Sequence, residues 1–431
     1  MVSPILSSRR LLVLVSGLAA AFCVLSVAST GAAQRQAVSV GSTTRITIGA
    51  VLDLSAGWTS LGRSSKVALE LAISDANAEL RRRGLPDRVV LRIEDAAGDP
   101  AKAARAVRGL AAAGARIIVG PQGSSEVAAA RPVADRLHVL LVSQGSTAHA
   151  LAQRDWVFRF VPDDVDETRA ASALIAHDGV SGIVPIWRDD AGNAGLASSI
   201  RTAVGARGGT VAEGLSYASD DPDFSAAVAS LSAQVAGLAA TNGSDRTAVY
   251  LAGFDEVVGL LTLAATDPVL ASVRWYGSDG VALTPALIAD QAASAFAAAA
   301  GYPNPTLGLD QAAERRSARL RKWIERRLGR ETDAFTLAAY DALRVGVDAI
   351  VTAGPASSSA GLRRSFVARA DGYTGMSGLI ELNAAGDRAF GSWDFYSVCP
   401  AGTGYEWLRT WSFLAPRQGA GTLLARAECS A

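Results

Sequence analysis

The chain is poor in the residues that most enzymes use for acid–base and metal chemistry. Its 431 residues include only three histidines and three cysteines. His138, His149 and His177 do not combine with the cysteines at zinc-ligand spacing, so we expect no metal site. The sequence also lacks a Gly-x-Ser-x-Gly elbow, a phosphate-binding Gly-Lys-Ser/Thr loop and a His-Glu-x-x-His motif. An exported enzyme stays open as an alternative, because carboxylates can act without histidine. We expect no catalytic residues and no cofactor.

Charge of one sign is not in excess either. Lys+Arg and Asp+Glu are balanced at 41 each, so nothing favours nucleic acid or an anionic membrane surface as a partner. The composition is 49% hydrophobic and 19% charged, which is typical of a globular protein with ample core. The length allows two to three domains.

One long apolar run stands out, and it lies at the N-terminus. Arg9 and Arg10 precede the run Leu11–Val27, which is followed by small residues. This order is typical of a secretory signal peptide, here residues 1–33. A membrane anchor is the alternative, but the run is short for a span and ends in a small-residue tract without basic stop-transfer residues. We therefore expect an exported protein that is soluble in the periplasm or at the exterior of the cell envelope after cleavage.

Two cysteines remain outside that segment, Cys399 and Cys429. In an oxidising compartment the simplest interpretation is one disulfide that closes a C-terminal loop. Two buried thiols are the alternative.

The rest of the chain alternates short apolar strands with helical patterns. The first series of expected strands is Arg45–Leu52, Arg88–Glu94, Arg116–Val119 and His138–Ser143. The second series is Gly182–Trp187, Thr210–Ser216, Thr247–Ala252 and Val273–Gly277. Repeated β-α units predict a parallel sheet with helices on both faces. We therefore expect an α/β fold of two doubly wound lobes with a cleft between them.

The last third of the chain is expected to be mixed. The elements we expect there are a strand at Ala292–Tyr302, helices at Asp310–Leu328, Asp333–Ala353 and Ala360–Ala370, and strands at Gly378–Leu382, Arg388–Val398 and Tyr405–Phe413.

Two Gly/Ser loops follow neighbouring strands in the first series, Gly120–Ser125 and Gln144–Thr147. Ligands sit at the carboxyl ends of parallel strands. Free backbone N–H groups and small hydroxyls at such an edge suit one compact anion, such as a carboxylate. Ordinary capped turns are the alternative, with Ser124 or Ser125 as the N-cap of the next helix.

The whole pattern resembles the type I periplasmic binding proteins, in particular the leucine/isoleucine/valine-binding family of ABC importers. The segments on which the resemblance rests are IGAVLDLSAGWTSLGRSSKVALELAISDAN, VGPQGSS, LLVSQGSTAHAL, FRFVPDD, AVYLAGFDEV and VRWYGSDGVA. The family fold implies two lobes joined by three crossovers, which we place near Pro162, Tyr302 and Ala389. The implied lobes are 44–162 with 302–388, and 163–301 with 389–431 including a C-terminal extension.

The resemblance also implies a ligand site. Ser124, with Ser125 beside it, falls on the loop that binds the ligand carboxylate. Gly145, Ser146 and Thr147 fall on the second carboxylate loop. Hydroxyls and helix N-termini suit a carboxylate, and a ligand that bridges both lobes favours the closed form.

The remaining implied contacts concern the ammonium and the side chain of the ligand. Asp279 falls on the acidic residue that receives the ammonium, Phe254 on an aromatic contact, and Leu61 on a side-chain contact with Trp58 close by. The alternatives are an Asp-Gly turn for Asp279 and core positions for Phe254 and Trp58.

The sequence departs from the family pattern at two places. Ala191 stands where many members have an aromatic residue, and Leu61 stands where a tyrosine is frequent. Trp187 and Arg188 are therefore candidates for the side-chain pocket, with a strand end and a solvated turn as the alternatives.

The resemblance implies a monomer that captures an amino acid, branched-chain or related, or a close analogue, and delivers it to ABC permease subunits. The alternative is a soluble sensor or regulatory binding protein of the same fold for an amide, urea or an aromatic carboxylate.

Overall fold

The structure is a computed structural model that describes residues 44–221, 223–354, 356–416 and 419–429. The expected signal peptide, 1–33, lies outside these residues. Within the described ranges, no helix is both long and apolar enough to cross a membrane.

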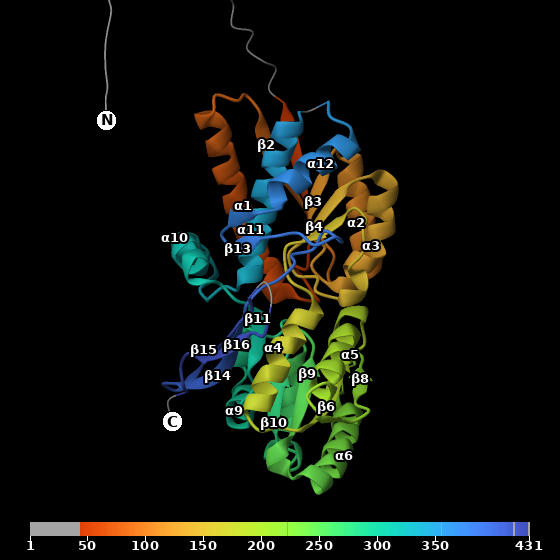
Figure 1. Cartoon of the computed structure of the whole chain (residues 1–431), viewed down its shortest axis with the longest axis vertical. Helices are drawn as coiled ribbons and strands as arrows, with labels where there is room; N and C mark the ends of the chain where they lie inside the picture. The colour runs from red at the N-terminus through yellow and green to blue at the C-terminus, as the bar shows by residue number, and fades with distance from the viewer. Residues whose placement is uncertain (1–43, 222, 355, 417–418, 430–431) are drawn as a thin grey trace, which may run out of the picture. The chain divides into compact units, whose positions relative to one another are not determined.

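The first sheet is wholly parallel and has the strand order β2-β1-β3-β4-β5. Its strands are β1 (Arg45–Leu52), β2 (Arg88–Asp95), β3 (Ile117–Val119), β4 (Leu140–Ser143) and β5 (Val157–Arg159). Helices pack on both of its faces (Figure 1): α1 (Thr59–Arg82), α2 (Pro100–Ala112), α3 (Ser124–Leu137), α11 (Ala334–Ala353) and α12 (Ser359–Ala370). We call this set of elements the first lobe.

Strand β3 shows how alternating side chains build two cores. Ile117 belongs to the apolar cluster that contains residues of α1 and α11. A Cβ added to Gly346 of α11 would lie 3.2 Å from the Ile117 side chain, so the two residues are in close contact. Ile118 belongs to the cluster of α2 and α3 and lies beside Leu110. Because both faces are covered, the strand is apolar throughout, as buried parallel strands are.

The second sheet is also parallel, with the order β10-β9-β6-β7 and with β8 pairing β6 as well. Its strands are β6 (Gly182–Arg188), β7 (Thr210–Val211), β8 (Leu215–Tyr217), β9 (Thr247–Ala252) and β10 (Arg274–Gly277). Its helices (Figure 1) are α4 (Asp164–His177), α5 (Ala191–Gly205), α6 (Ser225–Asn242), α7 (Val257–Ala264), α8 (Pro285–Ala289) and α9 (Gln291–Ala300). We call this set the second lobe. The fold is thus α/β with two doubly wound lobes, as expected.

The expected strand Ala292–Tyr302 is wrong, because this segment forms helix α9. The side chain of Asp290 caps the helix by accepting a hydrogen bond from Ala293 N at 2.9 Å. Gly301 ends it in the left-handed region, with φ 60°. A run of alanines has the highest helix propensity, and that preference prevails here over the apolar pattern.

The expected strand Thr210–Ser216 is divided into β7 and β8. Gly214 separates them with a φ of 69°. A Cβ at this position would approach Pro185 O to 2.1 Å, so only glycine allows the chain to turn so close to β6.

A third sheet is antiparallel, with the order β11-β14-β15-β16. Its strands are β11 (Asn304–Leu307), β14 (Trp393–Ala401), β15 (Gly404–Leu414) and β16 (Thr422–Ala425). Between β11 and β14 lie α10 (Gln311–Leu328), α11, α12 and the hairpin of β12 (Tyr373–Gly375) with β13 (Gly378–Ile380). A disulfide joins Cys399 on β14 to Cys429, with a Cα–Cα distance of 5.2 Å.

The order of the elements along the chain shows where it passes from one lobe to the other. It leaves the first sheet after β5 and enters the second lobe at α4, and it returns to the first lobe through α10 and α11. Strand β14 then follows the hairpin. The lobe limits 44–162 with 302–388 and 163–301 with 389–431 stay a prediction.

Candidate functional site

The first Gly/Ser loop connects β3 to α3. Gly123 is the N-cap residue of α3, so the alternative that Ser124 or Ser125 caps the helix is wrong. Their hydroxyls are used elsewhere. Ser124 Oγ lies 3.0 Å from Ser146 Oγ, and Ser125 Oγ accepts a hydrogen bond from Ala191 N of the second lobe at 3.1 Å. The two Gly/Ser loops therefore meet, and the first of them also contacts the second lobe.

The second Gly/Ser loop follows β4 and packs under apolar residues. Ser143 Oγ accepts a hydrogen bond from Ser146 N at 3.0 Å, which holds the turn. A Cβ at Gly145 would lie 2.9 Å from Leu61 Cδ2 and 3.1 Å from Trp58 Cζ3. Gly145, Leu61 and Trp58 are thus in contact, and both side chains are buried.

Arg159 of β5 holds this second loop through hydrogen bonds to backbone carbonyl groups. Its Nη1 donates to Ala148 O at 2.7 Å and to Ser146 O at 3.4 Å. Its Nε and Nη2 donate to the two carboxylate oxygens of Asp387 at 2.7 and 2.6 Å. Both side chains are almost fully buried. The sequence offered Arg159 only as part of FRFVPDD, and its partner lies 228 residues away.

The lobes touch each other through residues at the start of α1 and after β9. The rings of Trp58 and Phe254 stack with centroids 5.0 Å apart. Asp255 Oδ2 accepts hydrogen bonds from Thr59 Oγ1 at 2.9 Å and from Ser60 N at 3.0 Å. Helix α1 has no side-chain cap of its own. A carboxylate of the second lobe therefore caps a first-lobe helix, and the helix dipole stabilises its negative charge there.

Replacing Asp255 with alanine should weaken ligand binding by favouring the open form. A helix cap is worth about 0.5–2 kcal/mol, so the affinity should fall about 2- to 30-fold. The matched control is Asp290→Ala, which removes a cap within the second lobe and should lower stability without changing the affinity. Calorimetric titration of both variants measures this. Equal affinities of the Asp255 variant and the wild type would show that this cap plays no part in closure.

A cavity of about 280 Å³ opens beside the first loop. The residues that line it come from both lobes: Asp53, Gly57, Gly98, Pro100, Gly123, Ser124, Ser125, Glu126, Arg188, Asp189, Asp190 and Phe254. Arg188 Cζ lies 5.2 Å from the ring centroid of Phe254. Its guanidinium is paired with Asp190 at 2.8 Å and Glu256 at 3.3 Å. Its charge is therefore largely neutralised within the protein.

Two acids on the first-lobe side of this cavity were not anticipated from the sequence. Asp53 accepts hydrogen bonds from Trp58 N at 3.1 Å and from Gly98 N at 2.6 Å. Burial raises the pKa of Asp53. Burial, and then the neighbouring Asp53 charge, raise the pKa of Glu126 well above its usual range. The pair therefore favours a shared proton over two charges.

Thr147 and Asp279 do not line that cavity and are both buried. Asp279 N donates to Glu167 Oε1 at 3.2 Å, and Thr147 O accepts a hydrogen bond from Asp164 N at 2.9 Å. Burial, and then the charge of Asp164, raise the pKa of Asp279 well above its usual range, while a hydrogen bond from the Thr147 hydroxyl lowers it. Thr147 of the first lobe and Asp279 of the second are thus neighbours.

Trp187 does not join this group. It is half-buried on β6, and Arg201 Cζ lies 5.3 Å from the centroid of its ring. It is absent from the residues that line the cavity, whereas its neighbour Arg188 is among them, as expected for consecutive strand residues that point to opposite faces.

The pH dependence of stability should report on Asp164. Burial raises its pKa to about 7, while the Thr147 hydroxyl and the Arg159 charge lower it. A raised carboxyl pKa stabilises the fold fully below the unfolded value near 4, and this contribution is lost as the pH rises toward 7. In Asp164→Asn the free energy of unfolding should fall less steeply over this range, by up to about 1.4 kcal/mol per pH unit. Urea unfolding at pH 5, 6 and 7 measures the slopes, and parallel slopes for both proteins would contradict this.

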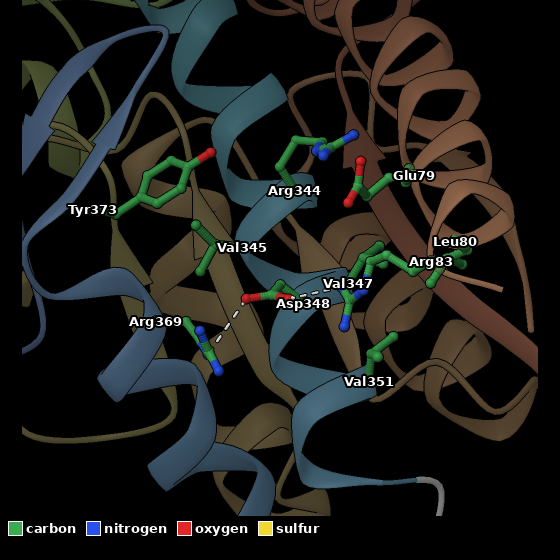
Figure 2. Close-up of a pocket in the computed structure, with 11 residues that line it drawn as sticks. Glu79, Leu80, Arg83, Arg344, Val345, Val347, Asp348, Val351, Arg369 and Tyr373 are labelled. Atoms are coloured by element: carbon green, nitrogen blue, oxygen red, sulfur yellow. Dashed lines mark ion pairs between the residues drawn. The ribbon is translucent and has the colours of Figure 1, made fainter. Parts of the chain in front are cut away.

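Another pocket, of about 230 Å³, lies between α1, α11 and α12 of the first lobe (Figure 2). Asp348 at its centre is paired with Arg83 at 3.5 Å and with Arg369 at 3.3 Å. These charges are partly exposed and neutralise one another. The pocket contains residues of one lobe alone, so a ligand there would not link the two lobes.

The two doubly wound lobes thus contact each other through the loops described above. Residues 45–403 match the family described as periplasmic binding protein. The chain therefore belongs to the periplasmic binding protein family.

Individual relatives agree with this assignment. A Leu/Ile/Val-binding protein of Rhizobium johnstonii is 27% identical over 323 residues, which are 73% of this chain and 81% of that protein. The crystal structure of a leucine-binding protein from Thermotoga maritima superposes with a TM-score of 0.69 at 20% identity, over 84% of this chain and 97% of that one. A solute-binding protein of an R. palustris ABC transporter, in complex with benzoate, gives 0.66 at 18% identity, over 85% and 96%. At 20% and 18% identity, these two crystal structures establish the fold alone.

Proposed function

We propose that the protein is the substrate-binding component of an ABC importer. It captures an amino acid, or a close analogue, between its lobes and presents the closed form to permease subunits in the periplasm or at the cell exterior. One observation supports this most. The hydroxyls of Ser124 and Ser146 meet in the first lobe at 3.0 Å, and the next residue, Thr147, adjoins the buried carboxylate of Asp279 in the second. Hydroxyl donors facing a carboxylate acceptor across an interface match the two ends of an α-amino acid.

A ligand held between these groups would also favour closure of the two lobes. The lobes already share the stacked pair Trp58–Phe254 and the cap that Asp255 provides. A ligand that bonds to both lobes adds differential affinity for the closed form, as hinge closure requires.

The test is a thermal-shift screen of the protein without residues 1–33. The probes are the twenty common amino acids, simple amides, urea and benzoate. A ligand at about a hundred times its dissociation constant adds about 2.7 kcal/mol of stability, which is easily seen. Stabilisation by at least one α-amino acid supports the proposal. Stabilisation by benzoate, urea or an amide alone would replace it with the sensor or aromatic-carboxylate alternative.

A further inference from the structure

Three carboxylic side chains gather behind the Gly/Ser loops. Asp164 and Glu167 stand one helical turn apart in the first turn of α4, so they share a face. Asp279 follows β10, and its backbone N–H donates to Glu167 Oε1 at 3.2 Å. The exposed fractions of the three are 1%, 0% and 4%. We call them the acidic triad.

The acidic triad has acceptor atoms that the protein does not satisfy. Oε2 of Glu167 and Oδ2 of Asp279 are buried without a hydrogen-bond partner. The hydroxyl of Tyr250, on the central strand β9, is fully buried and likewise unpartnered. After burial, the charges of the triad are the main causes that raise its pKa well above 10, so this hydroxyl lies among them.

The surroundings do not neutralise the acidic triad. Arg159 is the cation whose charge reaches Asp164, but its guanidinium is held in the two-bond pair with Asp387. Asp163 adds negative charge near Asp164, and the Tyr302 hydroxyl lies near Tyr250. In the part of the chain that the structure describes, no salt bridge within 4.0 Å involves any triad member.

Among the described residues, no group of three or more His, Cys, Asp or Glu is placed to hold a metal ion. An organic ammonium group carries several N–H donors, and each can bond to a carboxylate oxygen that the protein leaves without a partner.

We propose that the acidic triad binds a cationic group of the ligand, so that the substrates are amines and amino acids with a net positive charge instead of neutral branched-chain amino acids. This inference rests on the proposed function and specifies its substrate class. One α-ammonium needs one carboxylate, which Asp279 supplies. Asp164 and Glu167 are in excess of that need, and a buried carboxylate is tolerated when it is paired with a charge or holds a proton.

Proton release on ligand binding shows whether the triad exchanges bound protons for the charge of a ligand. Burial raises the pKa values of all three members, which favours their protonated forms in the free protein. A cationic ligand stabilises the ionised carboxylates and displaces those protons. Its affinity should therefore increase as the pH rises from 6 to 8, and binding should release protons.

The experiment compares L-ornithine with L-norvaline, which has the same carbon chain without the terminal ammonium. Isothermal titration at pH 6, 7 and 8, in two buffers of different ionisation enthalpy, gives affinities and proton release. We expect ornithine to bind at least about tenfold more tightly than norvaline, with the larger proton release. Glu167→Gln should weaken ornithine binding at least about tenfold and leave norvaline within about threefold. The control is Glu213→Gln, an exposed acid of the second lobe.

Every outcome decides one of the two proposals. Tighter binding of norvaline than of ornithine, unchanged in Glu167→Gln, overturns the cationic substrate class and leaves the proposed function intact. Binding of putrescine without binding of any amino acid supports the cation site and overturns the amino-acid substrate. If none of these probes binds the wild type, the cation site is wrong. If Glu167→Gln fails to fold, as circular dichroism would show, Asp164→Asn serves as the second variant with the same expected losses.

Discussion

Replacing Asp387 with alanine should lower the free energy of unfolding by about 3–5 kcal/mol. The substitution leaves the guanidinium of Arg159 buried, with an exposed fraction of 1%, and without its carboxylate. Removing one partner of a buried ion pair is costly because the other charge stays in a medium that solvates it poorly. The measurement is urea unfolding followed by circular dichroism.

The matched control for this prediction is Asp348→Ala. Asp348 also pairs with arginine, at 3.3 Å to Arg369, but both side chains are more than a third exposed. Exposed pairs contribute about 0–1 kcal/mol, so this variant should unfold almost as the wild type does. Equal losses in both variants would show that the Arg159–Asp387 pair has no special structural role.

The double variant Arg159→Met with Asp387→Leu separates stability from function. Replacing both charges with apolar groups should restore much of the stability that Asp387→Ala loses. Ligand binding should be impaired in the double variant, because the Arg159 donors to Ser146 O and Ala148 O are gone and the second Gly/Ser loop is no longer held. Normal binding by the double variant would assign Arg159 to stability alone.

Replacing Asp279 with asparagine should weaken binding of an amino-acid ligand about 30- to 5,000-fold. The carboxylate is buried, so its bond to a ligand ammonium forms away from water, where loss of one partner costs about 2–5 kcal/mol. The amide keeps the shape of the carboxyl group and avoids the cost of a buried charge beside Glu167 and Asp164, so the ligand-free protein should not lose stability.

The control for the Asp279 variant is Asp220→Asn, an exposed aspartate of the same lobe, which should bind as the wild type does. Calorimetric titration gives the affinities, and a melting curve shows that each variant is folded. If the Asp279 variant binds within about threefold of the wild type, the ammonium lies elsewhere.

The sequence predicted the features of the fold that depend on neighbouring residues. Continuous apolar runs such as β3 and β9 predicted buried parallel strands, because a sheet covered on both faces needs no polar side. The strand order along the chain then placed the two Gly/Ser loops at one edge. Helix α9 does not follow from its apolar pattern, because its alanines and one phenylalanine fit an apolar strand as well as a helix. The residues that distinguish the two are its caps, Asp290 and Gly301.

The parts of the site that depend on distant partners could not be predicted. Asp255 was an ordinary loop acid in the sequence, and its role follows from contact with Thr59 across 196 residues. Asp164 and Glu167 had the pattern of acids in a first helical turn, which already explained them. Their proximity to Asp279 depends on how α4 and β10 meet in the folded second lobe.

A crystal structure of the protein bound to the amino acid that the screen identifies would test the central claim most directly. We expect the ligand to lie between the lobes, with its carboxylate at Ser124, Ser146 and Thr147 and its ammonium at Asp279. A ligand bound in the first-lobe pocket around Asp348 (Figure 2), with no contact to the second lobe, would contradict it.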